Sequence, residues 1–115
     1  MDIREEKIGS VVKVMTAGRL TADCADQFKQ YMQEALARGR RFVLDLSGME
    51  YVDSTGLGAM VFMLQRIAEA GGELKIAGLQ AKPRVVFDIT RACKIFDIYP
   101  DVEKALAVLE PPSQA

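Results

Sequence analysis

A serine and a threonine follow an aspartate in the stretch DSTGLG, residues 53–58. A serine becomes a nucleophile when a neighbouring base takes its proton, and histidine is the commonest such base. The chain contains no histidine, which excludes a Ser-His-Asp triad and any histidine metal site. VDSTG does not match the G-x-S-x-G nucleophile motif, and the chain has no G-x-x-x-x-G-K-[ST] phosphate loop. The sequence therefore predicts no catalytic residue, no metal and no cofactor, with an enzyme that pairs Ser54 with a lysine or carboxylate base kept as an alternative.

The same residues suit the start of a helix. Aspartate and serine are good N-caps, because their side chains accept a hydrogen bond from a free N–H of the first turn. Capping accounts for one residue, whereas Asp53, Ser54 and Thr55 occur together and are followed by two glycines. A helix N-terminus carries a partial positive charge, so the fold tolerates a phosphate there. A phosphate on Ser54 would add roughly −1.5 to −2 charges to the surface without unfolding the domain, which favours a phosphorylation switch at a partner interface.

A helix is predicted from about 55 to 70, closed by Gly71 and Gly72. At about 100° per residue, its core stripe comprises four apolar residues with two more at the margin: Leu57, Val61, Leu64 and Ala68, then Met60 and Ile67. Phe62 projects toward water, one turn after Gly58. Such an aromatic is either an isolated surface residue or part of a partner surface, and Met63 is likewise either core filling or surface.

The rest of the chain must position this helix. Apolar runs typical of strands cover 10–18, 41–48, 73–78 and 95–99, and a weaker edge strand at 3–9 is joined to the first by a hairpin at Gly9 and Ser10. Further helices are expected over 21–38, 84–92 and 102–109, the first capped by Thr21 or Asp23 and ended by Gly39. This alternation predicts an α/β fold: one layer of mostly parallel strands with about four helices, plus an N-terminal antiparallel edge strand.

The length and charge of the chain limit the other possibilities. Its 115 residues suit one domain over 1–110, followed by a tail at 111–115 that we expect to be disordered. A net charge of −1 gives no field that would attract nucleic acid. The longest apolar run, LGAMVFML, is too short to span a membrane, and MDIREEKIGS lacks the apolar region of a signal peptide. We therefore expect a cytoplasmic protein, and no feature demands an oligomer.

The stretch VLDLSGMEYVDSTGLGAMVFMLQRIAEAGGELKIAGL, residues 43–79, resembles the core of a STAS domain. AGRLTADCADQF and IYPDVEKAL extend the likeness over nearly the whole chain, and within the family it is most similar to bacterial anti-sigma factor antagonists. The resemblance implies a protein without catalytic activity that binds an anti-sigma factor, often a GHKL-type serine kinase, and so frees a sigma factor. It implies phosphorylation of Ser54 by the kinase and reversal by a phosphatase.

The resemblance also implies which residues meet the partner. Asp53 matches the aspartate that precedes the family serine, and Thr55, Gly56, Leu57 and Gly58 match the helix start where the partner docks. Many relatives carry an aspartate in a G-x-L-D element, whereas this chain has GRLT, which places the uncharged Thr21 there. We therefore expect recognition of the kinase at this position to differ from that in the relatives that carry the aspartate.

A second hypothesis keeps the fold and changes the partner. STAS domains also occur as stand-alone subunits of lipid-transport ABC complexes and as parts of anion transporters. The intact DST element favours the phosphorylation-controlled antagonist, and recovery of a transporter ATPase in a pull-down would favour the other.

Overall fold

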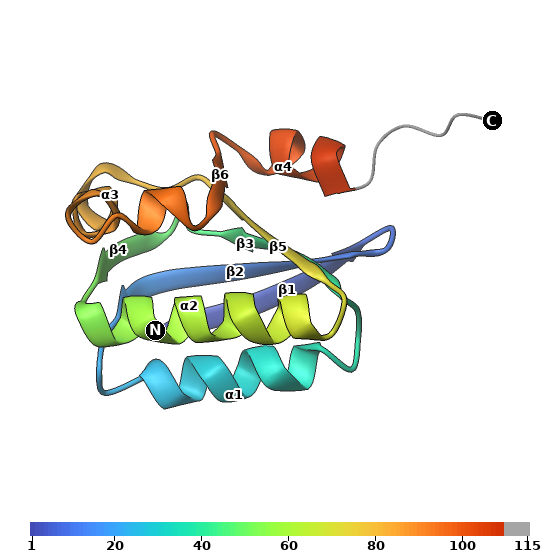
Figure 1. The fold of residues 1–115 in the computed structure, drawn as a ribbon, viewed down its shortest axis with the longest axis horizontal. Coiled ribbons are helices and arrows are strands. Elements are labelled where there is room, and N and C mark those ends of the chain that lie inside the picture. Colours follow the sequence, from blue (N-terminus) through green and yellow to red (C-terminus); the bar gives the residue numbers. More distant parts are fainter. Residues whose placement is uncertain (110–115) are drawn as a thin grey trace.

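The computed structural model describes residues 1–109, which fold as a six-stranded sheet with four α-helices and one short 3₁₀ turn (Figure 1). The elements in chain order are β1 (Asp2–Ile8), β2 (Val11–Leu20), α1 (Ala25–Ala35), β3 (Arg41–Asp45), β4 (Met49–Val52), α2 (Ser54–Glu69), β5 (Glu73–Ala77), α3 (Ala81–Ile89), η1 (Ala92–Lys94), β6 (Asp97–Tyr99) and α4 (Val102–Leu109). The predicted α/β class is confirmed. The tail predicted at 111–115 lies outside the described residues.

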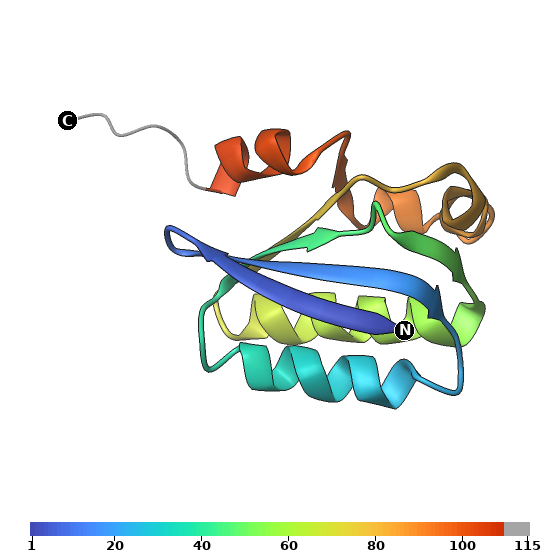
Figure 2. The ribbon, with the colours of Figure 1, turned by 180° about the vertical axis from the view of Figure 1, so that it is seen from behind.

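The strand order is β1-β2-β3-β5-β6, and β4 pairs separately with β2. All pairings are parallel except that of β1 with β2, which are joined by the predicted hairpin. Gly9 makes this turn with φ +61°, a conformation that glycine adopts without strain. Figure 2 shows that the hairpin turn and the start of α2 lie at opposite ends of the molecule. The start of α2 therefore lies on the side where the parallel strands have their carboxyl ends.

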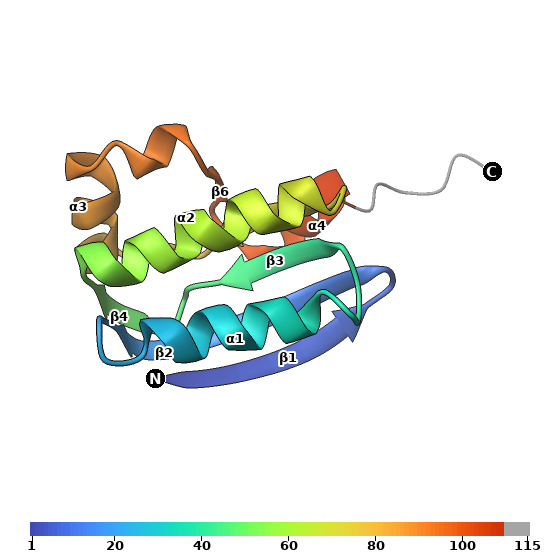
Figure 3. The ribbon, with the colours of Figure 1, turned by 60° about the horizontal axis from the view of Figure 1, so that its bottom comes forward.

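The helices cover the two faces of the sheet unequally. Helices α1 and α2 lie side by side on one face (Figure 3), and the larger core lies beneath them. Helix α4 covers part of the other face, where Ala105 and Leu109 pack on Val11, Val43 and Ala77. The helix predicted over 102–109 is thus confirmed, and Asp101 caps it, since its Oδ1 accepts from the Lys104 N–H at 2.9 Å.

Strand β4 was not predicted. The chain turns after β3, where Asp45 Oδ1 accepts from the Ser47 N–H at 3.0 Å. It then runs as β4 beside the last residues of β2, past an irregularity at Gly18 and Arg19. The sequence gives little signal for a four-residue strand that contains a glutamate, because its partner is about thirty residues away in the chain. β4 matters here because it leads directly into Asp53 and Ser54.

The predicted ends of the first helix were wrong. α1 begins at Ala25 with Cys24 as N-cap, and neither Thr21 nor Asp23 caps it. The helix closes at Leu36, so Gly39 is not its C-terminal residue. A Cβ on Gly39 would lie 2.9 Å from Cγ2 of Val12, so the glycine instead permits close packing on β2.

The predicted core stripe of α2 was wrong in part. Leu57 is buried as predicted, and so are Met60 and Ile67, which were placed at the margin, but the buried face is rotated by about one residue or 100°. Met60, Met63 and Ile67 are fully buried, whereas Ala68 is exposed. Val61 and Leu64 are only half-buried. The helix is apolar around much of its circumference, so the sequence offers two neighbouring stripes, and packing against both the sheet and α1 selects one of them. Met63 is therefore a core residue.

Candidate functional site

Asp53 fixes the start of α2. It is the N-cap residue with an extended backbone, and its Oδ1 accepts from the Gly56 N–H at 2.7 Å. Its Oδ2 accepts from the Ala22 N–H at 3.0 Å, and its own N–H donates to the Leu20 carbonyl at 3.2 Å. Both carboxylate oxygens are thus engaged, one by the helix and one by the β2–α1 turn. Asp53 holds two segments together that are about thirty residues apart in the chain.

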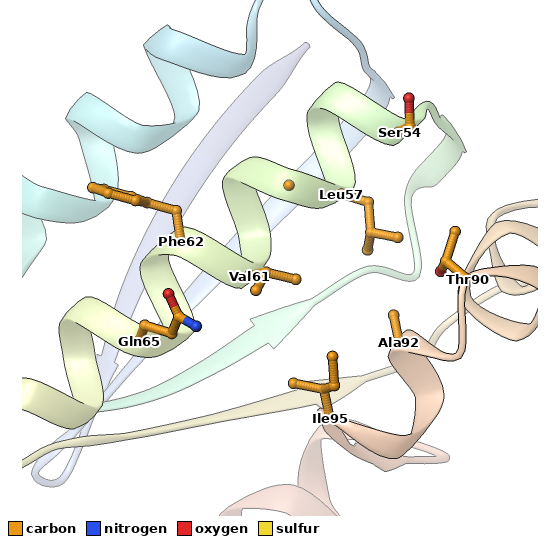
Figure 4. Close-up of a pocket in the computed structure, with 9 residues that line it drawn as sticks. Ser54, Leu57, Val61, Phe62, Gln65, Thr90, Ala92 and Ile95 are labelled. Atoms are coloured by element: carbon orange, nitrogen blue, oxygen red, sulfur yellow. The ribbon is translucent and has the colours of Figure 1, made fainter.

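Ser54 is the first residue of α2 and is exposed, as is Thr55. The Ser54 hydroxyl points outward from the end of the helix in Figure 4. Because Asp53 already caps the helix, the fold does not depend on this hydroxyl. A group attached to Ser54 would project into solvent beside the positive end of a 16-residue helix.

The two glycines of the DSTGLG element have different surroundings. Gly56 is buried, and a Cβ there would collide with the Leu20 carbonyl and lie 2.9 Å from Leu20 Cγ. Glycine is needed at this position so that α2 can approach the end of β2. Gly58 is exposed, and an added Cβ would have no atom within 4 Å. Nothing inside the domain requires a glycine at 58.

Thr21 lies in the β2–α1 turn, which Asp53 holds through Ala22. Its hydroxyl donates to the Asp23 carboxylate, and this hydrogen bond is the main reason that the pKa of Asp23 lies below its ordinary value. The hydrogen bond from the Ala22 N–H to Asp53 holds this turn next to the start of α2. Thr21 and Ser54 come from segments that the structure brings together.

A groove of about 410 Å³ runs along the exposed side of α2 from Ser54. Figure 4 shows α2 as one wall, and the end of α3 together with η1 as the other. The lining residues are Ser54, Leu57, Gly58, Val61, Phe62, Gln65, Thr90, Ala92 and Ile95. Sequence reasoning identified the α2 wall but missed the second wall, because its residues lie about thirty positions further along the chain.

Two buried aromatic residues position the second wall. Phe87 of α3 and Phe96, just after η1, pack with their ring centroids 5.8 Å apart. Both are anchored in the larger core. Ala92, between them, is buried as well, whereas Ile95 remains 56% exposed. Its side chain points toward Leu57 and Val61 across the groove (Figure 4).

Phe62 projects from α2 as the sequence predicted and is 40% exposed. Its ring points toward α1 (Figure 4), where the Lys29 ammonium lies 5.1 Å from the ring centroid. A cation over an aromatic face is a favourable contact. Phe62 therefore forms the rim of the groove on the α1 side and carries both an apolar surface and a neighbouring charge.

Within residues 1–109, no group of three or more histidine, cysteine, aspartate or glutamate side chains is placed to hold a metal ion. Across the same described part of the chain, no helix combines the length and apolar character that crossing a membrane requires. The site consists of an exposed hydroxyl at a helix start and an adjacent apolar groove.

Comparison with known proteins gives a consistent result. The chain is 29% identical over 112 residues to an anti-sigma F factor antagonist from Paenibacillus polymyxa, covering 96% of each chain. It is 30% identical over 87 residues to an anti-sigma-B factor antagonist from Bacillus subtilis, covering 76% of this chain and 80% of the relative. The Bacillus protein SpoIIAA shares the fold in its unphosphorylated form, with a TM-score of 0.82, 14% identity and coverage of 98% and 100%. Its phosphorylated form gives a TM-score of 0.72 at the same identity, covering 95% and 100%.

The family model of the STAS domain matches residues 2–105, which include every strand and the whole groove. The mostly parallel sheet, the antiparallel first strand and the helix that begins at Ser54 are the features of that fold. The chain belongs to the STAS domain family.

Proposed function

We propose that this chain is an anti-sigma factor antagonist that acts in the cytoplasm. In the proposal it binds an anti-sigma factor while Ser54 is unmodified and dissociates when Ser54 is phosphorylated, so that the modification controls release of a sigma factor. The observation that carries the proposal is the exposed Ser54 at the start of α2, next to an apolar groove. The names of the two sequence relatives support the partner class. Ser54 has no catalytic role in this proposal.

The geometry supports a switch that leaves the fold intact. Asp53 caps the helix through Gly56 and holds the neighbouring turn through Ala22, and neither bond involves Ser54. A phosphate at the helix start is also favoured by the helix dipole. The proposal is supported by SpoIIAA, a neighbour of the same fold whose structures include an unphosphorylated and a phosphorylated form. The added charge therefore acts on the partner rather than on the core.

The proposed contact surface comprises Thr21, Thr55, Gly58 and Phe62, with Ser54 at its centre. All five are exposed or half-buried. Gly56 is left out because it is buried against Leu20. Asp53 contributes by holding Ser54 and the turn in place, since both of its oxygens are already bonded within the domain.

We propose that the modifying enzyme is the anti-sigma factor itself, a GHKL-type serine kinase, and that a phosphatase removes the phosphate. The test is incubation of the purified chain with ATP and the GHKL-type kinase encoded nearest to its gene, followed by mass spectrometry of the peptide that contains residues 53–58. We expect one phosphate on the wild type and on Thr55→Ala, and none on Ser54→Ala.

The matched pair of variants separates the two hydroxyls, because both are exposed and lie next to each other. Phosphate on Ser54→Ala but not on Thr55→Ala would move the switch to Thr55. If an active kinase leaves all three proteins unmodified, the proposed regulation is wrong.

A further inference from the structure

The groove beside Ser54 has an uneven distribution of charge. Between residues 81 and 95 the chain carries four basic residues and one acidic residue: Lys82, Arg84, Arg91, Lys94 and Asp88. The whole chain has a net charge of −1, so this excess of positive charge is local. Arg91 precedes η1, Lys94 is its last residue, and both are exposed. They place two cations next to Ala92 and Ile95 of the groove wall.

Two cations on the other side of the groove have a carboxylate neighbour within the domain. Lys29 of α1 lies 3.4 Å from the Asp26 carboxylate, and Arg66 of α2 lies 3.5 Å from that of Glu69. Among residues 1–109, by contrast, no carboxylate lies within ion-pair distance of Arg91. The positive charge on the η1 side is therefore available to an external anion.

Arg91 also has an unusual backbone. Its φ is +62°, and it is the one non-glycine residue with positive φ in the described part of the chain. This left-handed conformation costs a side-chain-bearing residue of the order of 1 kcal/mol or more, which glycine would avoid. Arg91 thus carries an exposed, charged side chain at a position where glycine would be less strained.

Resting on the function proposed above, we infer that the groove docks an acidic, apolar-faced segment of the anti-sigma partner. The apolar side chains of that segment lie against Leu57, Val61 and Ile95, and its carboxylates pair with Arg91 and Lys94. Apolar burial supplies most of the affinity, and the charge pairs fix the orientation.

This partner chemistry explains why a phosphate on Ser54 acts as a switch. Ser54 lines the same groove as Ile95, so its phosphate places a dianion where an acidic segment binds. A like charge in a docking surface is strongly unfavourable, and we expect it to lower the affinity at least ~10-fold. Repulsion alone then accounts for dissociation without a conformational change.

The test uses two synthetic amphipathic peptides of about twelve residues, long enough for three helical turns. Both carry leucines on one face, with glutamates on the other face of the first peptide and lysines on that of the second. Titration into the ¹⁵N-labelled chain should shift the amide signals of Gly58, Val61, Ala92 and Ile95 with the glutamate peptide, which should bind at least ~5-fold more tightly than the lysine peptide.

Charge-removing variants provide the control. Lys94→Gln should lower the affinity for the glutamate peptide about 3-fold to 10-fold at low salt. Neither lysine lines the groove itself, but Lys94 is adjacent to the lining residue Ile95, whereas Lys82 borders a different pocket. Lys82→Gln removes the same charge from α3 and should therefore change the affinity less than ~2-fold. Arg91→Gly should weaken the peptide while keeping or raising the melting temperature, because it relieves the positive φ. Ser54→Asp should weaken the glutamate peptide and not the lysine peptide.

Equal binding of the two peptides, shifts confined to another face, or no binding of the glutamate peptide at millimolar concentration would overturn the inference. No kinase is present in this experiment, so its result is separate from the phosphorylation assay. If the glutamate peptide binds but Ser54 is not phosphorylated, the inference about the groove holds and the proposed phosphorylation is wrong. Phosphorylation of Ser54 with no preference for the acidic peptide would refute the groove assignment alone.

Discussion

The two glycines of the DSTGLG element are expected to respond in opposite ways to the same substitution. A methyl group at 58 would have no neighbour within 4 Å, so Gly58→Ala adds only the better helix propensity of alanine. That difference is about 0.5–1 kcal/mol in an exposed helix interior. For a domain of this size, we expect the melting temperature to rise by roughly 2–5 °C.

A methyl group at 56 would instead collide with the Leu20 carbonyl and lie 2.9 Å from its carbonyl carbon. The obstacle is backbone that is itself bonded to the Asp53 N–H, so it cannot move without opening the start of α2. Overpacking of this kind costs about 1–3 kcal/mol. Gly56→Ala should therefore lower the melting temperature by roughly 3–12 °C.

Thermal unfolding followed by circular dichroism measures both variants directly. Ala68→Gly is the matched control, because Ala68 is exposed on the same helix and does not line the groove. It should lower the melting temperature by about as much as Gly58→Ala raises it. A fall for Gly58→Ala, or no change for Gly56→Ala, would show that the packing at the start of α2 is misassigned. If Gly58→Ala also binds the partner as wild type does, Gly58 does not belong to the contact surface.

Three further variants test the rest of the account by denaturant unfolding. Asp53→Ala should lower the free energy of unfolding by about 1–3 kcal/mol, because it removes the helix cap and the hydrogen bond to the β2–α1 turn. A decrease below ~0.5 kcal/mol would contradict this role. Met63→Ala should lower the free energy of unfolding by about 2–5 kcal/mol, because Met63 is buried in the core. The same substitution of a surface methionine would lower it by less than ~1 kcal/mol. Glu5→Gln should cost about 1–2 kcal/mol at pH 7, because the Glu5 carboxylate accepts two hydrogen bonds from Arg38 at 2.8 Å. These bonds are the main reason that the pKa of Glu5 lies below 4.5. Its contribution is complete above pH 4.5 and is lost as pH falls through the lowered pKa, so wild type and Glu5→Gln should converge in acid; a constant difference down to about pH 2 would refute this.

Strands and helices were predicted well where the spacing of apolar residues within the segment determines them. The period-2 and period-3.6 patterns placed most strands and helices, and the exposure of Ser54 and Phe62 follows from the helix that begins after Asp53. The predictions failed where contacts between segments distant in the sequence determine the structure. β4 exists because it pairs with the end of β2, and Gly56 is needed because of the approach of Leu20.

The side of α2 that faces the core could not be predicted for the same reason. The helix is apolar on two neighbouring sides, and the choice between them depends on α1 and the sheet, which no spacing within α2 reveals. The second wall of the groove was missed for a related reason, since Thr90, Ala92 and Ile95 meet α2 only in the folded chain. A sequence signal did exist there, in the two cations that flank Ala92 and Cys93, but only the fold places them beside Ser54.

The central claim is that charge at Ser54 decides whether the partner binds while the domain stays folded. The most direct measurement is isothermal titration of the anti-sigma factor into three forms of the chain: unmodified, phosphorylated on Ser54, and Ser54→Ala. We predict that the Ser54→Ala form binds within about 3-fold of the unmodified chain and that the phosphorylated form binds at least ~10-fold more weakly, with melting temperatures of all three within ~2 °C. Equal affinity of the phosphorylated and unmodified forms, or loss of binding that accompanies unfolding, would contradict the account.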